Sequence, residues 1–509
     1  MSGLPRRYGR TVTSSYATVV VQAVGTVVMT PVLVKGLGRT GYGVWALALS
    51  LVLYLQLLEF GFARTVIRAV AAAEGVGDRD GVRRAITTSV VVLAVPGTLA
   101  LLAGLTLAAI FPALFDLDPV LAGQAQVICA MIAVALAVSL PSDTFGGTLM
   151  AFQRFDLLNC TLVAVTVLEA IGWFVVLRLG GGLVAVGAVT VVIGLAGQLA
   201  RFLFARRLVG HVSLTREWFD RTLIRRFASV SVWFFLRDLA DILVHRVDVL
   251  VVGLVVGVPE AGIYAVAQKL SLLAERSIAP ATVTFFPESA LLAATDDRER
   301  LRSTVLTGTR IALGLAGPIC LTLGLLARPA IDVWVGGSFA AAAPVVVLLA
   351  GATAVKALTR TGLLALQGMG HVRFPALVLA GEAVLNLALS IGLGRTMGLQ
   401  GVALGTFLAA VTAELVITLP VMCHKLGIPL RAFVASVGRA HLPALAVAGP
   451  LGALLRPQVQ GIVAVLLAAS AIGGTYLVIF SFTGLDAEER RRVRRVLNRR
   501  RPEASSTAG

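Results

Sequence analysis

The chain has few charged residues. Asp, Glu, Lys and Arg together make up 14% of its 509 residues, whereas a soluble domain usually holds about 25%. Hydrophobic residues make up 57% of the chain, and the mean hydropathy is +0.90. This composition excludes an ordinary water-soluble fold and predicts an all-α protein that crosses a membrane many times.

Cysteine is also scarce, and no convincing motif for a bound cofactor is present. The four cysteines, which all lie in apolar segments, are Cys129, Cys160, Cys320 and Cys423. They form no CxxC pair, so neither a disulfide framework nor a thiolate metal site is expected. The chain holds no Walker A sequence, and its one GxGxxG pattern, Gly36-Leu-Gly38-Arg-Thr-Gly41, lies between two apolar spans and predicts a tight turn. We therefore expect no cofactor and no metal.

Fourteen apolar stretches are long enough to cross a bilayer, which needs about 20 residues. They fall at about 12–34, 43–66, 85–110, 120–147, 156–178, 182–205, 229–255, 261–288, 304–327, 339–366, 374–395, 399–422, 440–456 and 460–482. Basic residues collect in alternate loops, which by the positive-inside rule places both termini in the cytoplasm. The net charge of +17 then reflects topology and does not indicate a nucleic-acid partner.

A repeat divides the chain. The segment Gly38-Arg-Thr-Gly-Tyr-Gly43-Val-Trp45 returns 219 residues later as Gly257-Val-Pro-Glu-Ala-Gly262-Ile-Tyr264. An even number of helices in each unit makes the two repeats parallel in the membrane. The predicted domains are a six-helix lobe at 1–210, a second at 211–425, two further helices at 426–484 and a basic cytoplasmic tail at 485–509.

The predicted span at 229–255 carries too many charges to face lipid. Arg237, Asp238, Asp241, His245 and Asp248 fall within about a third of the circumference of a helix. A charged group at mid-membrane costs roughly 2.5–3.5 kcal/mol on the insertion scale, so this face must be paired or wet. We interpret it as part of a substrate or ion pathway. The alternative is that Arg237 and Asp241, at i and i+4, form a purely structural ion pair.

Six more charged residues lie in or near other spans. These candidates are Glu59, Arg64, Glu169, Lys269, Arg276 and Glu382. Lys269 and Arg276 share one helix face and suit an anionic group such as a diphosphate. They could equally pair with acids of the preceding span or extend toward the membrane surface. Glu169 and Glu382 lie deep within their spans and are the stronger candidates; Glu414 is a further isolated charge.

Several short motifs resemble those of a known superfamily. They are Leu37-Gly38-x-x-x-Tyr42-Gly43-x-Trp45, Leu57-Leu-Glu59-Phe-Gly61-Phe-Ala63, Arg246-Val-Asp248-Val-Leu-Val-Val-Gly253, Ala261-Gly262-Ile-Tyr264 and Gly398-Leu-Gln-Gly401-Val-Ala403. Together they resemble the multidrug/oligosaccharidyl-lipid/polysaccharide (MOP) exporter superfamily, in its polysaccharide (O-antigen type) flippase branch. The resemblance covers about residues 10–425. It implies two lobes around a central cavity and alternating access in the bacterial cytoplasmic (inner) membrane.

We therefore expect a transporter, not an enzyme. Its substrate would be an undecaprenyl-diphosphate-linked oligosaccharide, with basic residues meeting the diphosphate and acidic residues meeting sugar hydroxyls or a coupled H⁺ or Na⁺. Membrane lipids and the glycosyltransferase or polymerase machinery of the same pathway are expected partners.

Three other functions stay open. They are flipping of a lipid-linked peptidoglycan precursor, cation-coupled multidrug export, and a membrane glycan polymerase or ligase. The last is least favoured, because every predicted external loop is short. Drug export is disfavoured by an aromatic content of only 6%, since drug sites favour aromatic linings.

Overall fold

The computed structural model describes residues 4–59, 62–210, 218–220, 246–282, 297–371 and 373–485, and a few single residues between 239 and 295. Within these ranges all regular secondary structure is helical, as predicted. In chain order the elements are α1 (Leu4–Gln56), η1 (Leu57–Glu59), α2 (Phe62–Gly75), α3 (Arg79–Leu114), α4 (Pro119–Ala151), α5 (Phe155–Arg178), α6 (Leu183–Val209), α8 (Val247–Val255), α9 (Val258–Thr282), α11 (Arg298–Trp334), η3 (Gly337–Phe339), α12 (Ala342–Gly368), α13 (Arg373–Val411), η4 (Thr412–Thr418), α14 (Leu419–Leu426), α15 (Leu430–Leu455), η5 (Arg456–Gln458) and α16 (Ile462–Thr483).

Ten helical segments of the described chain are long and apolar enough to cross a membrane. The protein is thus a multi-pass membrane protein. Two of the ten correspond to two predicted spans each: Val20–Glu59 covers most of those at 12–34 and 43–66, and Arg373–Leu426 contains those at 374–395 and 399–422. The predicted span at 229–255 falls mostly outside the described residues, which include only its last turns in α8. The total of fourteen spans therefore stays a prediction.

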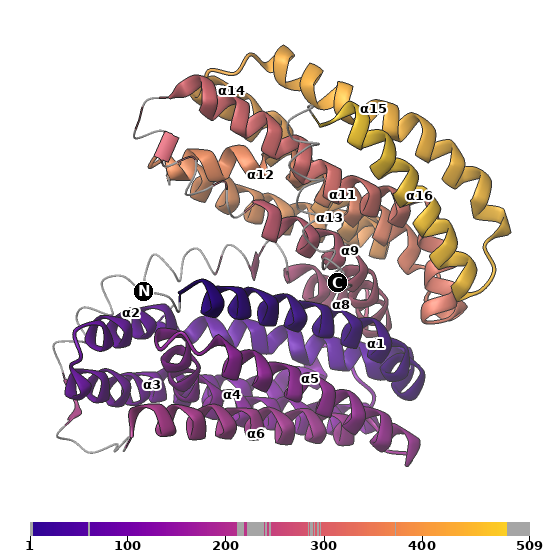
Figure 1. The fold of residues 1–509 in the computed structure, drawn as a ribbon. Helices are drawn as coiled ribbons and strands as arrows, with labels where there is room; N and C mark the ends of the chain where they lie inside the picture. Colours follow the sequence, from indigo (N-terminus) through magenta and orange to yellow (C-terminus); the bar gives the residue numbers. More distant parts are fainter. Residues whose placement is uncertain are drawn as a thin grey trace, which may run out of the picture. The chain divides into compact units, whose positions relative to one another are not determined.

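Helix α1 is two helices joined at Gly38. A straight helix of its 53 residues would be about 80 Å long, far more than the ~30 Å hydrocarbon core. Gly38 adopts φ 69° and ψ −177°, a conformation that only glycine reaches cheaply. Before the turn, Gly36 of α1 lies against Leu177 of α5. After the turn, Trp45 of α1 packs edge-on against Trp173, which lies one helical turn before Leu177 on α5. The chain therefore reverses at Gly38, which confirms the predicted tight turn (Figure 1).

Helix α13 is a hairpin of the same kind. Gly398 breaks it with φ 61° and ψ −138°. A Cβ atom at Gly401 would overlap the carbonyl oxygen of Leu393, and one at Gly405 would lie 2.7 Å from the amide nitrogen of Ser390. These pairs are nearly symmetric about Gly398, so the two arms run antiparallel. Only glycine at positions 401 and 405 permits so near an approach of the two arms.

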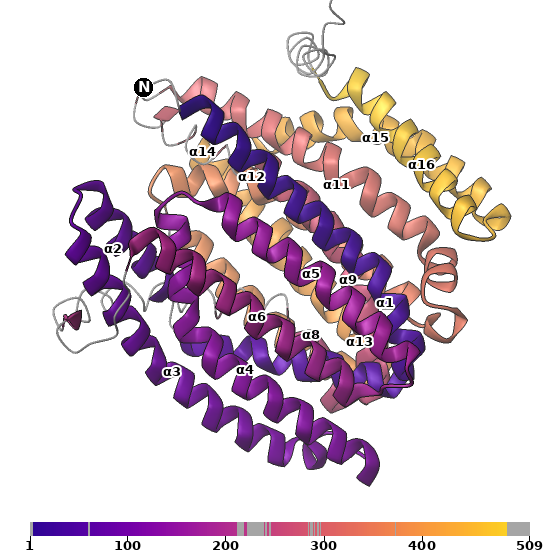
Figure 2. The ribbon, with the colours of Figure 1, turned by 60° about the horizontal axis from the view of Figure 1, so that its bottom comes forward.

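Residues 1–266 and 391–402 form one compact unit, here called unit 1. Helices α3 and α4 pack along each other, α6 lies against α4 and α5, and α5 lies against α1 (Figure 2). The short helix α2 rests on α3 and α4. The buried residues of this packing include Ile86, Phe145 and Ala205, contributed by α3, α4 and α6.

The two copies of the sequence repeat meet inside unit 1. A Cβ atom at Gly43 would overlap the carbonyl oxygen of Val258, and one at Gly262 would lie 2.9 Å from the carbonyl oxygen of Arg39. The spacing of 219 residues that relates Gly43 to Gly262 also relates Arg39 to Val258. The two contacts are therefore equivalent under the repeat. The glycines bring the backbones of α1 and α9 together without an intervening side chain.

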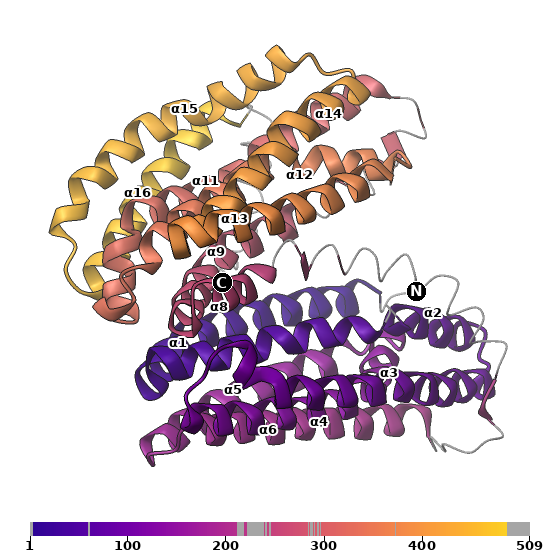
Figure 3. The ribbon, with the colours of Figure 1, turned by 180° about the vertical axis from the view of Figure 1, so that it is seen from behind.

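Residues 267–390 and 403–509 form unit 2. Helices α11 and α12 pack along each other, and the pair α15–α16 lies against α11 (Figure 3). Helix α15 begins ten residues before the predicted span at 440–456. The residues that the prediction left out include Arg431 and Arg439, which are exposed on α15 and do not end the helix. His441, inside the predicted span, is buried, and its Nδ1 lies 2.9 Å from the hydroxyl of Tyr476, so this polar ring has a partner.

Candidate functional site: a polar seam inside unit 2

A buried ion pair joins α12 and α13 in unit 2. The ammonium of Lys356 lies 2.8 Å from Oε1 of Glu382. The Glu382 side chain is 4% exposed and that of Lys356 is 25% exposed, so the carboxylate is buried and the lysine is mostly buried. Charged groups inside membrane-spanning helices are costly unless paired, and this pair meets that condition.

A second carboxylate approaches from the segment after α13. Glu414 is 6% exposed, and its Oε2 accepts a hydrogen bond from Oγ1 of the fully buried Thr359, one turn along α12 from Lys356. Glu414 lies on η4, a seven-residue π-helical segment. Such wide turns are rare and often mark functional sites, because they displace one side chain out of the regular helical register.

A third carboxylate, Glu275 on α9, is near enough for its charge to act on Lys356 together with those of Glu382 and Glu414. The helices converge here because the neighbouring residues are small: Ala274 and Ala357 are both almost completely buried in the packing of α9, α11 and α12. We call Lys356, Glu275, Glu382 and Glu414 the Lys356 cluster.

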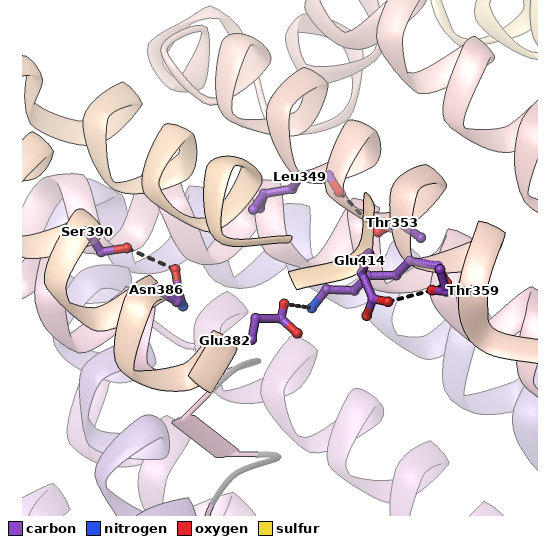
Figure 4. A network of polar contacts seen from close by, with 8 residues as sticks. Leu349, Thr353, Thr359, Glu382, Asn386, Ser390 and Glu414 are labelled. Carbon is purple, nitrogen blue, oxygen red and sulfur yellow. Dashed lines mark hydrogen bonds and ion pairs between the residues drawn. The ribbon is translucent and has the colours of Figure 1, made fainter. Parts of the chain in front are cut away.

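The polar residues continue along α13. Asn386 and Ser390 follow Glu382 at intervals of four residues and are both buried, and the Ser390 hydroxyl donates to Oδ1 of Asn386 at 3.1 Å. Figure 4 shows these three side chains on one face of the helix, with Glu414 and Thr359 opposite Glu382. Together they form a polar seam several turns long inside unit 2.

Glu382 also borders a groove of about 300 Å³ between the first arm of α13 and η4. Its other lining residues, which are mostly apolar, are Phe374, Leu377, Val378, Gly381, Leu385, Thr412, Ala413 and Ile417. The charged seam is thus separated from the groove by little more than the Glu382 side chain.

Of the predicted site residues, the structure brings Glu382 into this seam. Asp248, in unit 1, is 2% exposed, and its Oδ2 accepts a hydrogen bond of 2.8 Å from the hydroxyl of Tyr264 on α9. This bond joins the two sides of the Gly257 turn, so Asp248 has at least one role in holding α8 against α9. Its predicted role in the pathway is untested.

The remaining predicted residues are dispersed. Arg237, Asp238, Asp241 and His245 lie outside the described residues. Arg64 lies in α2, but its side chain is not among those described. Glu59 ends η1 and Glu169 lies in the middle of α5, both half-buried. On α9, Lys269 is half-buried and Arg276 is exposed. The predicted charged face therefore stays a prediction.

Sequence reasoning missed Lys356. A signal was present, since it is a lone lysine in the middle of the apolar span at 339–366, and such a residue needs a partner. Glu382 and Glu414 were identified as isolated acids. What the sequence lacks is the relative register of α12, α13 and η4, which decides that the three side chains meet.

Comparisons with known proteins agree with this architecture. Residues 10–291 match the family model described as "Polysaccharide biosynthesis protein". The uncharacterized membrane protein EpsK of Bacillus subtilis (strain 168) is 22% identical over 397 residues, which is 77% of this chain and 78% of that protein.

Two solved structures share the fold. The lipid II flippase MurJ, in an inward closed conformation, superposes with a TM-score of 0.73 at 13% identity, covering 93% of this chain and 98% of its own. A multidrug resistance MATE family transporter of the MOP superfamily, in an inward-facing conformation, gives a TM-score of 0.70 at 15% identity, covering 81% of this chain and 95% of its own. The predicted fold class, an all-α membrane protein, is thereby confirmed. The chain belongs to the polysaccharide biosynthesis protein family and has the fold of the MOP-superfamily transporters.

Proposed function

We propose that the protein moves a lipid-linked oligosaccharide, of the undecaprenyl-diphosphate type, from the inner to the outer leaflet of the bacterial cytoplasmic membrane by alternating access. The observation that carries this proposal is the family match over residues 10–291. It is supported by a fold shared with a flippase of a lipid-linked substrate.

The polar seam of unit 2 suits the coupling of translocation to a cation. One elementary charge that crosses a potential of 100 mV releases about 2.3 kcal/mol, so a coupled H⁺ or Na⁺ can drive the cycle. The Lys356 cluster provides carboxylates inside the span, where such an ion would act. The diphosphate would be met by basic residues, for which the predicted face with Arg237 and the pair Lys269 and Arg276 are the candidates.

A second candidate function is flipping of a lipid-linked peptidoglycan precursor. The observation that favours it is that the MurJ structure covers 93% of this chain, against 81% for the MATE transporter. Depletion of the cell's own peptidoglycan-precursor flippase distinguishes the two functions. Rescue of growth by this protein would support the second function, and failure of rescue would support the first.

Deletion of the gene tests the leading proposal. Loss of surface glycan, with accumulation of the lipid-linked intermediate in the inner leaflet, is expected. Among complementing variants, Glu382→Gln should reach the membrane yet fail to restore the glycan, whereas Lys425→Ala, an exposed lysine on α14, should restore it. Normal glycan in the deletion strain would overturn the proposal.

The predicted charged face and the topology need separate tests. Arg237→Ala and Asp241→Asn should leave the protein in the membrane and abolish surface glycan; unimpaired export would remove these residues from the pathway. The proposed orientation, with both termini in the cytoplasm, is checked by reporter fusions at each end. Reporter activity outside the cell would contradict it.

A further inference from the structure

A pocket of about 540 Å³ lies in unit 2 at the C-terminal end of α11. Its walls come from the last turns of α11 and from the connection between α15 and α16, which lie side by side (Figure 3). The polar lining residues are Arg328, Asp332, Arg456 and Gln460, and the rest of the lining is small or apolar. The pocket is separate from the polar seam and shares no residue with it.

The two arginines give this pocket a net positive charge. Arg328 donates through Nε to Oδ2 of Asp332 at 2.9 Å, so one arginine is balanced by one carboxylate. The Arg456 side chain pairs with no residue that the structure describes. Its guanidinium therefore keeps its N–H donors for an outside acceptor, in the fork geometry that suits a phosphate group. The start of α16 at Gly461, which has no side-chain cap, adds positive potential at the same place.

A positively charged group finds little to bind in this pocket. Asp332 is the one acidic residue in the lining. Its Oδ2 is engaged by Arg328, and its Oδ1 is buried. An ammonium group would therefore lie near two guanidinium groups, and like charges repel. The charges select an anion.

The pocket lies where membrane-spanning helices end. Leu454 on α15 and Ile462 and Val463 on α16 are large, apolar and exposed, as expected for helix faces that contact lipid. Trp334, the last residue of α11, is of a type that gathers at the membrane–water interface. A molecule that fills the pocket and also covers these apolar faces needs a polar head and hydrocarbon chains.

Basic residues are scarce on this side of the predicted topology. The residues that it places in or next to outer loops are Lys35, Arg39, Arg178, Arg328, Arg395 and Arg456. Arg328 and Arg456 are far apart in the sequence, yet they line the same pocket. Arginines that only mark helix ends would have no reason to converge in this way.

We propose that this pocket binds the phosphate of an anionic phospholipid of the outer leaflet, whose acyl chains lie on the exposed faces of α15 and α16. The phosphate lies between the guanidinium groups of Arg328 and Arg456, with Gln460 as a further hydrogen-bond donor. The bound headgroup links the end of α11 to the α15–α16 connection and stabilises their packing. This inference does not depend on the proposed transport function.

The experiment measures the melting temperature of purified full-length protein in a neutral detergent with added lipid. Dioleoyl phosphatidylglycerol should raise the wild-type Tm saturably, on the order of 2 °C, and dioleoyl phosphatidylcholine should raise it much less. Arg456→Gln should melt as wild type without lipid and bind phosphatidylglycerol about tenfold more weakly. Arg395→Gln is the matched control, because Arg395 is an exposed arginine of the same predicted side that does not line the pocket.

A second variant tests the site with Arg456 in place. Asp332→Asn releases Arg328 and raises the positive charge of the pocket, so it should bind phosphatidylglycerol more tightly than wild type. Unchanged or weaker binding would overturn the inference, even if Arg456→Gln fails to fold.

Three other results would also overturn it. An equal response of wild type and Arg456→Gln to phosphatidylglycerol would mean that the lipid acts elsewhere. An equal response of wild type to the two lipids would mean that the headgroup charge is not recognised. A Tm rise of the same size with inorganic phosphate at the same concentration would mean a site for free anions and not for a lipid. No glycan substrate enters these measurements, so their failure is distinguishable from failure of the proposed flippase function.

Discussion

Breaking the ion pair between Lys356 and Glu382 by mutation should lower the free energy of unfolding more than the loss of any exposed ion pair does. Glu382→Gln removes one charge of a pair whose carboxylate is 4% exposed and whose atoms lie 2.8 Å apart. Removing one partner of a buried pair typically costs 3–5 kcal/mol, because the other charge stays buried and uncompensated. Lys356 keeps part of its exposure and the charges of Glu275 and Glu414, so we expect the lower end of that range, about 3 kcal/mol.

A double-mutant cycle isolates the pair. Lys356→Met with Glu382→Gln leaves no unpaired charge between the two positions, so the double variant should lose about 2 kcal/mol less than the sum of the single losses. The measurement is the free energy of unfolding of the purified protein in mixed micelles. The control cycle uses Arg328 and Asp332, a pair at 2.9 Å whose side chains are 56% and 37% exposed, for which about 0.3–0.5 kcal/mol is expected. Strict additivity at Lys356 and Glu382 would refute the reasoning.

Three further predictions concern the turns and the repeat. Gly262→Val should lower stability by about 1–3 kcal/mol, because its side chain would press against the backbone at Gly43. Tyr264→Phe withdraws a hydrogen bond from the buried Asp248 and should cost about 1–3 kcal/mol. Gly398→Ala forces a side chain into a backbone conformation near φ 61° and should also cost about 1–3 kcal/mol.

Thermal melting of the purified variants checks all three. Gly449→Ala is the control for the glycine variants, because a Cβ atom there meets nothing within 4 Å; it should melt as wild type or slightly higher, since alanine favours a helix. Wild-type melting of Gly262→Val would contradict the backbone contact of the repeat, and wild-type melting of Gly398→Ala would contradict the sharp turn in α13. Tyr264→Phe melting as wild type would show that another donor serves Asp248.

Much of the fold follows from local sequence signals. Hydrophobic length located most helices to within a few residues, and the Gly38 turn was expected because a glycine-rich segment separates two spans. The repeat at Gly43 and Gly262 was visible as a pattern, but its consequence, a symmetric backbone contact, required the structure. Helix α15 begins ten residues before the span predicted at 440–456, because the charged residues Arg431 and Arg439 lower the hydropathy of its first turns without ending the helix.

The site was less predictable than the fold. Each charged residue of the Lys356 cluster stands alone in its own span, and no local pattern links Lys356 to Glu382 or Glu414. The π-helical turn that carries Glu414 has no sequence signature in Thr412–Thr418. Such pairings depend on the vertical and rotational register of neighbouring helices, and that register is set by packing of small residues such as Ala274 and Ala357 across the whole unit.

The most direct test of the proposed function is translocation by the purified protein in liposomes. A fluorescent undecaprenyl-diphosphate oligosaccharide is placed in the inner leaflet, and its arrival outside is followed by cleavage with an added glycosidase. We predict that vesicles with wild-type protein expose the glycan much faster than protein-free vesicles, and that Glu382→Gln vesicles do not. Equal rates in wild-type and protein-free vesicles would contradict the account.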